Sequence, residues 1–447
     1  MIPITFYDRF TMGFSLGVHI ILATIGIALP AIIAVAEFLY LKYKDRYYDI
    51  LASRLTIVLA VLFAVGTASG TLVAVNLLVL WPKFMQLIGT VAILPFFTEV
   101  FAFFGEAILL GVYLYSRHKI RSGYIRLAII IAIGFFAALS GVLITMINAF
   151  MNTPVGFNIP TYLSTGIITG VNPLAVFDTP STGIEVFHVI STSYLAGTSI
   201  FFAYFALMLL RSMDNERKRN YYKKAVKLTF AIILVAVILS IISGLLSIPM
   251  LLHLQPEKYA AVELNLISGS HAPEVLFGFY SSATNSIVDG ISVPNLQSIL
   301  ANGTASTVVP GLNQFPKSTW PPLFIHDLFD IMVLIGFGLG FFCLVILILA
   351  FLKKKVFENR IALWLYAVFS AFVLILLESG WVVDEVGRQP WIVYNIMTVQ
   401  QAANQSASII PLAIGVIIVY IVILPATIYA LKKIFDGRPL EKDLGDQ

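Results

Sequence analysis

A run of 22 residues with the sequence IMVLIGFGLGFFCLVILILAFL (residues 331–352) contains no charged side chain. An α-helix needs about 20 apolar residues to cross the hydrocarbon core of a bilayer, so this run is long enough to span it. Eight further stretches have the same character. The nine predicted spans are residues 13–41, 55–80, 88–114, 127–151, 184–210, 228–252, 328–352, 361–383 and 408–431.

The composition agrees with these spans. Of the 447 residues, 59% are hydrophobic and 12% are charged, and the mean hydropathy is +0.92. Soluble domains carry about twice that charged fraction. We therefore predict an all-α fold, a polytopic transmembrane bundle of about nine helices. The single cysteine, Cys343, excludes a disulfide within this chain, a CxxC metal site and a cysteine-attached haem.

The basic residues predict the orientation of the bundle. Of the 28 lysines and arginines, 23 fall on alternate connections, where short loops rich in positive charge stay in the cytoplasm. The N-terminus is therefore predicted outside and the C-terminus inside, which requires an odd number of spans. The net charge of +4 is explained by this asymmetry and does not indicate nucleic-acid binding. The five basic residues on the other side are Arg9, Lys83, Lys258, Lys317 and Arg388.

Two connections are much longer than the others, residues 152–183 and residues 253–327, and both are predicted outside. Loops of this length in a compact protein usually have a function. The chain accordingly divides into residues 1–252 with six spans, residues 253–327 as an outer loop, and residues 328–447 with three spans.

Several glutamates lie within the predicted spans. Ionisable groups in membrane helices are costly and usually mark a site or a pathway. Glu99, Glu106 and Glu378 are the plainest examples, and the spacing of seven residues places Glu99 and Glu106 on one face of the third span. Two interpretations remain: pairing with polar groups inside the bundle, or a path for protons.

Two histidines, His19 and His188, lie in the outer third of apolar spans. A lone helical histidine is usually a hydrogen-bonded core residue, but the topology brings both to the same outer level as Met332 and Glu385. Haem iron accepts histidine and methionine as axial ligands, and a His/Met pair makes a six-coordinate electron-transfer centre. His188 and Met332 could form such a pair, although methionine is also ordinary filler in apolar helices.

The most specific stretch is GWVVDEVGRQPW, residues 380–391, where the eighth span leaves the membrane on the outer side. Arg388 follows Glu385 by three residues and lies between Trp381 and Trp391. Such an arginine could hold a haem propionate while the glutamate faces the metal. The alternative is an interfacial tryptophan belt with an anchoring arginine.

With this stretch the sequence resembles subunit I of the cytochrome bd-type quinol oxidases, whose signature GWxxxExGRQPW matches residues 380–391. The resemblance runs along most of the chain. Arg9 and His19 have the family's usual separation. Three further stretches are similar to family motifs: WPKF (81–84), NAFMNTPVG (148–156) and QPEKYAAVE (255–263).

The resemblance implies the following ligands. His188 and Met332 would bind a low-spin haem b, and His19 and Glu385 would bind two high-spin haems, one a haem b and the other a haem d or a further haem b. The resemblance does not assign His19 or Glu385 to a particular high-spin haem. Residues of the haem environment would be Arg9, Trp381, Arg388 and Trp391.

The resemblance also implies an activity and a setting. Gln255, Lys258 and Glu263 would contact quinol in the outer loop, so that quinol is oxidised at the outer face and dioxygen is reduced to water. A route for cytoplasmic protons would be lined by Glu99, Glu106, Ser140 and Asn148. The chain would lie in the plasma membrane of a prokaryote with a second membrane subunit, and the resemblance leaves open a small single-helix subunit as a further partner.

Three features depart from the family pattern. Asp330 stands where the family commonly has arginine, two residues before the methionine ligand; the loss of a cation near a haem should lower its potential. Glu99 and Glu106 are seven residues apart instead of eight, and the outer loop is short. The alternatives are a secondary transporter with buried carboxylates and, with less support from only six histidines, a haem-copper oxidase. The sequence leaves ubiquinol and menaquinol both open.

Overall fold

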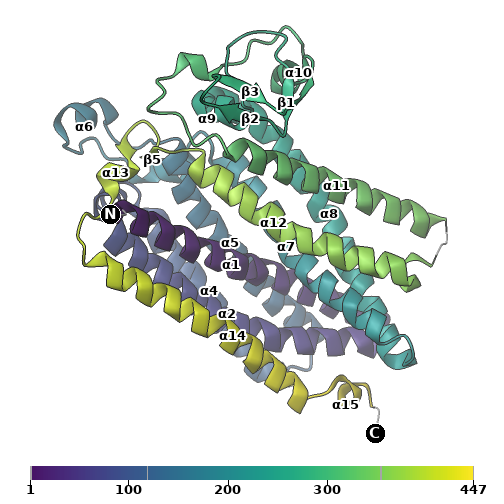
Figure 1. The fold of residues 1–447 in the computed structure, drawn as a ribbon. Coiled ribbons are helices and arrows are strands. Elements are labelled where there is room, and N and C mark those ends of the chain that lie inside the picture. Colours follow the sequence, from purple (N-terminus) through teal and green to yellow (C-terminus); the bar gives the residue numbers. More distant parts are fainter. Residues whose placement is uncertain (1–2, 118, 353–354, 446–447) are drawn as a thin grey trace.

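The computed structural model describes residues 3–117, 119–352 and 355–445. Long helices lie side by side and form a bundle (Figure 1). In these described ranges nine helices are long and apolar enough to cross a membrane, which confirms the predicted number. They are α1 (Ile4–Tyr43), α2 (Arg46–Leu80), α4 (Ile93–Ser116), α5 (Gly123–Asn152), α7 (Thr182–Arg211), α8 (Glu216–Leu254), α11 (Ile325–Phe351), α12 (Arg360–Val386) and α14 (Ile409–Gly437).

Several helices extend beyond their apolar runs. The helices α1, α2 and α8 begin about nine to twelve residues earlier than the predicted spans. Polar caps explain two of these extensions: the Asp45 side chain accepts a hydrogen bond from Tyr47 N, and Asn215 accepts one from Lys218 N. A capped polar turn continues a helix outside the hydrophobic layer, and hydropathy alone does not register it.

The predicted third span, residues 88–114, is wrong at its start. A separate helix, α3 (Pro82–Val91), precedes α4, and the chain breaks at Ala92, whose φ is −121°. Pro82 occupies the first turn of α3, where a proline is tolerated because that N–H has no partner inside the helix.

The helix α1 lies in the interior of the bundle and packs against α2, α5, α7, α12 and α14 (Figure 1). Leu29, Ile32 and Ile33 of α1 are fully buried. Contact with α7 is especially close at Gly197, where a Cβ atom would lie 2.5 Å from Ala28 Cβ and 2.6 Å from Thr24 O. Small residues permit such close approach between membrane helices.

The two ends of the bundle differ. One end, which we call the loop end, carries the start of α1 and all the long connections, whereas α14 ends at the opposite end (Figure 1). The fold class is confirmed as helical, but the all-α prediction missed short strands at the loop end. The short helices at this end are α6 (Ile159–Thr165), η1 (Pro173–Asp178), α9 (Pro256–Val262), α10 (Leu296–Asn302), η2 (Leu312–Gln314) and α13 (Val399–Ala402). The short strands are β1 (Glu274–Leu276), β2 (Phe279–Ser281), β3 (Ser286–Val288), β4 (Ile291–Val293), β5 (Trp391–Val393) and β6 (Met397–Thr398). The strands form three antiparallel pairs, β1 with β4, β2 with β3 and β5 with β6.

Ion pairs dominate the opposite end, which carries η3 (Val356–Glu358) and α15 (Leu440–Leu444). Glu37 of α1 is fully buried there, and its carboxylate lies 2.9 Å from Arg117 Nη2 and 3.2 Å from Arg126 Nη2. The Tyr113 hydroxyl donates a further bond of 2.8 Å to Glu37. Because every charge in this group has a partner, burial of Glu37 is tolerated. The basic connections thus gather at a single end of the bundle.

Candidate functional site

The signature stretch covers the end of α12 at the loop end and contains three charged side chains, Asp384, Glu385 and Arg388. Glu385 Oε2 lies 2.7 Å from Arg388 Nη2, and Glu385 Oε1 accepts a bond of 2.6 Å from Asn148 Nδ2 of α5. The Arg388 side chain is only 1% exposed. A guanidinium buried so deeply needs anionic or polar partners, so the motif builds a polar site inside the molecule rather than a membrane-surface anchor.

Asn152, the last residue of α5, joins this site to its neighbours, and the sequence analysis assigned it no role. Its Nδ2 lies 3.0 Å from Glu185 Oε1 and 3.3 Å from Asp384 Oδ1. Its Oδ1 accepts bonds of 2.7 Å from Arg388 Nη1 and 3.2 Å from Gln255 Nε2. Asn152 therefore connects α5, α7, α12 and the residue before α9. An amide can do this because it both donates and accepts.

Lys258 of α9 belongs to the same polar site. Its Nζ forms an ion pair of 2.7 Å with Asp384 Oδ1 and also donates to the Asp384 carbonyl at 3.0 Å. A Cβ atom on Gly387 would lie 3.0 Å from Lys258 Cε and 2.3 Å from Val383 O. A side chain at position 387 would therefore press on the carbonyl of Val383 in α12 and on the Lys258 side chain.

On a helix, the spacing of five residues predicts that Lys258 and Glu263 share a face, with Ala260 and Ala261 leaving room between them for a flat quinol ring. The structure does not show such a face: Lys258 pairs with Asp384 of α12, whereas the Glu263 carboxyl interacts with Glu274 of β1. Ala260 and Ala261 are fully buried, in a cluster with Ile325 of α11 and Val383 of α12. The short helix α9 uses its alanines to pack on the bundle, so no flat ring fits between them.

The predicted haem ligands on α1, α7 and α11 each lie against a glycine of another helix. A Cβ atom on Gly70 would lie 3.1 Å from His19 Cε1, and one on Gly380 would lie 3.1 Å from Met332 Sδ. A Cβ atom on Gly244 would lie 3.7 Å from His188 Cε1. At each of these contacts the neighbouring helix has no side chain, so the predicted ligand packs directly against its backbone.

The nitrogens of the two histidines are consistent with metal binding. His188 Nδ1 lies 3.0 Å from Ser243 Oγ, so Nε2 is the nitrogen left for a metal. His19 Nδ1 is buried and has no hydrogen-bond partner within the described part of the chain. Across the described ranges no group of three or more His, Cys, Asp or Glu side chains is placed to hold a metal ion. Haem iron needs only one or two axial ligands from the protein, so this donor set fits haem.

The other predicted haem neighbours surround the signature stretch. Arg9 of α1 donates a hydrogen bond to the Gln389 side chain. Trp381 packs on the main core cluster, and Trp391 begins β5, where it pairs with Thr398. Trp391 Nε1 is buried without a partner among the described residues, so it is free to donate to a bound group.

The predicted proton-route residues fall into two separate contacts. Ser140 Oγ of α5 donates to Glu99 Oε1 of α4 at 2.6 Å, and Asn148 contacts Glu385 as described above. Ser140 and Asn148 are eight residues apart on α5, about 12 Å along its axis. Glu106 is buried on α4, 7% exposed. Glu99 therefore contacts α5, although its spacing from Glu106 departs from the family pattern.

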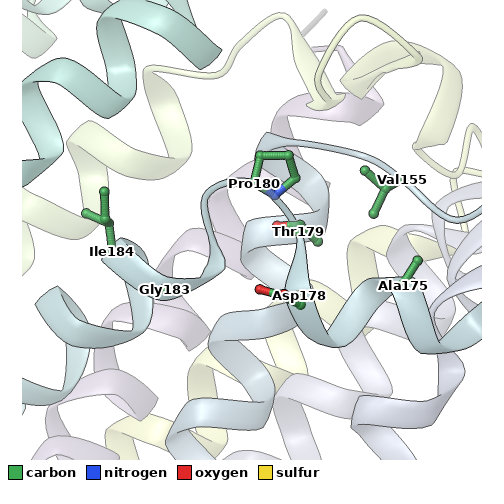
Figure 2. Close-up of a pocket in the computed structure, with 7 residues that line it drawn as sticks. All are labelled: Val155, Ala175, Asp178, Thr179, Pro180, Gly183 and Ile184. Carbon is green, nitrogen blue, oxygen red and sulfur yellow. The ribbon is translucent and has the colours of Figure 1, made fainter.

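A pocket of about 590 Å³ opens in the connection between α5 and α7 (Figure 2). Its lining includes Val155, Asp178, Thr179 and Ile184, and Figure 2 shows these side chains around the turn that leads into α7. None of the residues predicted from the sequence lines this pocket. It borders the site at two places: Glu185 directly follows Ile184, and Thr179 accepts a bond of 3.0 Å from Thr153, which directly follows Asn152.

Comparisons with known proteins agree with this geometry. The family model described as "Cytochrome bd terminal oxidase subunit I" matches residues 7–439. The chain is 37% identical over 98% of its length to the putative cytochrome bd menaquinol oxidase subunit I of Bacillus subtilis, covering 97% of that protein. It is 26% identical over 87% of its length to the cytochrome bd ubiquinol oxidase subunit 1 of the same organism, covering 84% of that protein.

A solved structure is also similar. The bd oxidase of Geobacillus thermodenitrificans contains a chain that matches 97% of this one with a TM-score of 0.90 and 35% identity, and 99% of that chain is covered. Family, fold and signature motif therefore agree over nearly the full length. The chain belongs to the cytochrome bd terminal oxidase subunit I family.

Proposed function

We propose that this chain is the haem-bearing subunit of a plasma-membrane oxidase that oxidises quinol at the loop end and reduces dioxygen to water. The observation that carries the proposal is the set of His19, His188, Met332 and Glu385, each held at the loop-end half of the bundle beside a glycine or an arginine. When bound, haem supplies electron transfer and oxygen chemistry. Membership of the cytochrome bd terminal oxidase subunit I family supports the quinol oxidase activity.

The proposed haem content is the one that the family implies. His188 and Met332 are the ligands of a low-spin haem b, while His19 and Glu385 are ligands of the two high-spin haems, one of type b and the other of type d or b. Arg388 and Arg9 are cations for propionates, and Trp391 is a donor. The buried Arg388 guanidinium, now paired with Glu385, would exchange part of that pairing for a propionate when the carboxylate turns to iron.

The quinol is menaquinol in this proposal, because the relative with 37% identity is named a menaquinol oxidase and the one named a ubiquinol oxidase is 26% identical. Gln255 and Lys258 hold the ring oxygens, and Glu263 accepts a hydroxyl proton. Since Ala260 and Ala261 are buried, the ring lies at the edge of α9 and not between these alanines.

Protons for oxygen reduction come from the basic end, which is cytoplasmic if the positive-inside rule holds. Glu99, Ser140 and Glu106 hold and pass them between α4 and α5, and Asn148 orients Glu385. Protons from quinol leave at the loop end. Charge is thus separated across the bilayer by the positions of the two half-reactions alone.

A second membrane subunit covers part of the bundle. Large apolar side chains on α2, α4 and α14 are exposed, for example Leu78, Phe101 and Ile421. Both lipid and a partner helix would suit such faces. The family description "subunit I" favours a partner on some of this surface, with a small single-helix subunit as a further component.

The test is purification of the oxidase with optical spectra, haem extraction and oxygen consumption driven by menaquinol. We expect three haems in the wild type. His188→Ala should lose the low-spin haem, and Glu385→Ala should lose high-spin haem and oxygen reduction, because a metal ligand is not replaced by water as readily as a propionate partner is. Arg388→Leu should therefore keep more haem than Glu385→Ala. A His188→Ala protein with an intact low-spin band would contradict the assignment.

A further inference from the structure

Two glutamates of the long loop form a buried pair, and only one of them has a role in the proposed function. Glu263 follows α9 and Glu274 begins β1, and each is 6% exposed. Their carboxyl groups lie close enough that each acts on the acidity of the other. Two neighbouring carboxyl groups in a buried site do not both ionise easily, so the pair favours a state with one shared proton.

Polar groups of three elements face the pair. Tyr259 of α9 lies beside it, with Gln297 of α10 next to the phenol. His326 and Asp330 of α11 approach from the bundle and act on Glu274 through their charges. In the described ranges no lysine or arginine forms an ion pair with either carboxyl, so no cation neutralises a second negative charge.

His326, beside Asp330, has one ring nitrogen that is hydrogen-bonded and one that is not. Its Nδ1 lies 2.7 Å from Val262 O, and because a carbonyl only accepts, Nδ1 carries the hydrogen. Its Nε2 is fully buried, 3.6 Å from Asp330 Oδ2, and has no hydrogen-bond partner among the described residues. Asp330 is held by the Phe277 N–H at 2.5 Å. One oxygen each of Glu263 and Glu274 is likewise buried and unbonded within the described part.

Burial and mutual repulsion change the acidity of the pair. Burial raises the pKa of Glu263 well above its ordinary value, and the charges of Glu274 and Asp330 raise it further. Burial also raises the pKa of Glu274. Two adjacent carboxyls in a dry site cannot both ionise easily, so they bind and release one proton together. At a pH at which an exposed glutamate is ionised, such a pair can still bind a proton.

The pair also links the proposed substrate side to the surface. Glu263 lies on the same short segment as Lys258. Glu274, the first residue of β1, follows the exposed Pro273, and opposite it on β4 stands Val293, between the exposed Ser292 and Pro294. Val262 and Leu264, the chain neighbours of Glu263, are both buried. The segment that carries Glu274 is therefore nearer the surface than the segment that carries Glu263.

We infer that Glu274 is a second proton-accepting residue for quinol oxidation, paired with Glu263, and that it passes quinol protons to water at the loop end. The inference rests on the proposed function. In each of two successive steps a quinol O–H bond breaks, a carboxyl O–H bond forms on the pair, and one electron leaves the ring for the oxidase's electron-accepting centre. The pair then releases the proton to water, so one quinol yields one quinone, two protons and two electrons.

The experiment compares Glu274→Gln with the wild type in the assembled oxidase, using menaquinol-driven oxygen consumption across pH. A positioned general base contributes about 10²–10⁴-fold, and because Glu263 remains we expect a loss of about tenfold. Removal of the Glu274 charge should lower the pKa of Glu263, so the acid limb of the pH profile should move to lower pH. Haem bands and turnover with an artificial electron donor should be unchanged.

The matched control is Glu257→Gln, because Glu257 is a buried carboxyl of α9 that accepts a bond of 2.6 Å from Thr319 and does not contact the pair. Its pH profile should match the wild type. If Glu274→Gln fails to assemble, Glu274→Asp keeps the carboxyl and should keep the acid limb in place at a lower rate.

The inference would be overturned if Glu274→Gln kept both the wild-type rate and the wild-type acid limb of the pH profile. It would also be overturned if the acid limb moved in Glu274→Asp. A wild-type protein without haem or menaquinol oxidation would instead contradict the proposed function.

Discussion

At the scale of single residues, the polar site depends on an amide that carries no charge. Sequence reasoning selected histidines, carboxylates and basic residues because their burial is costly, and the structure brings Glu385, Arg388, Asn148 and Lys258 into one site. Asn152 escaped attention because asparagine at the end of a helix is usually a simple capping or turn residue. Its place in the stretch NAFMNTPVG was the signal available.

The first prediction concerns this amide. In Asn152→Ala, Arg388 and Glu185 each lose a buried partner. An unsatisfied buried polar group costs about 1–3 kcal/mol, so the melting temperature of the oxidase should fall by several degrees. Asn302→Ala, at an exposed residue of α10, should change it little. The measurement is thermal unfolding in detergent for both variants, and equal melting temperatures would show that other groups or water replace the Asn152 contacts.

At the scale of elements, apolar length correctly predicted which segments form long apolar helices and failed at the ends of these helices. Starts such as Arg46 and Glu216 depend on side-chain caps, and the break at Ala92 depends on local backbone geometry, neither of which changes the mean hydropathy of a window. The strands β1 to β4 are three residues each. Strands that short carry too few alternating residues to give a periodic signal.

The second prediction concerns the contact of α1 with α7. Gly197→Ala would place a methyl group 2.5 Å from Ala28 Cβ and 2.6 Å from a backbone oxygen, which cannot move aside as a flexible side chain can. Overpacking of this kind costs about 1–3 kcal/mol. The matched variant is Gly415→Ala on α14, where a Cβ atom meets nothing within 4 Å. Thermal unfolding should separate the two, with a lower melting temperature for Gly197→Ala alone; equal values would mean that α1 and α7 adjust without cost.

At the scale of the whole molecule, the distribution of basic residues in the sequence and the fold both indicate a bundle with two chemically different ends. The basic connections share one end with the ion pairs of Glu37 and of Asp443, whereas the carboxyl pair, Lys258 and the end of α12 share the other. In the proposed function, quinol protons are released to water at the end where the pair lies. The direction of charge separation therefore depends on which end faces the cytoplasm.

The last prediction tests that orientation. Cys343 is buried, and in a Cys343→Ser background single cysteines can report each end. Ser306→Cys lies in the exposed part of the long loop, and Asp214→Cys lies in the exposed turn between α7 and α8 at the basic end. Because positive loops stay in the cytoplasm, a membrane-impermeant maleimide added to intact cells should label Ser306→Cys and leave Asp214→Cys unlabelled until the cells are made permeable. Labelling of Asp214→Cys in intact cells, together with protection of Ser306→Cys, would show that the bundle has the opposite orientation. Quinol protons would then be released into the cytoplasm, and oxidation at the loop end would no longer contribute to charge separation in the proposed direction.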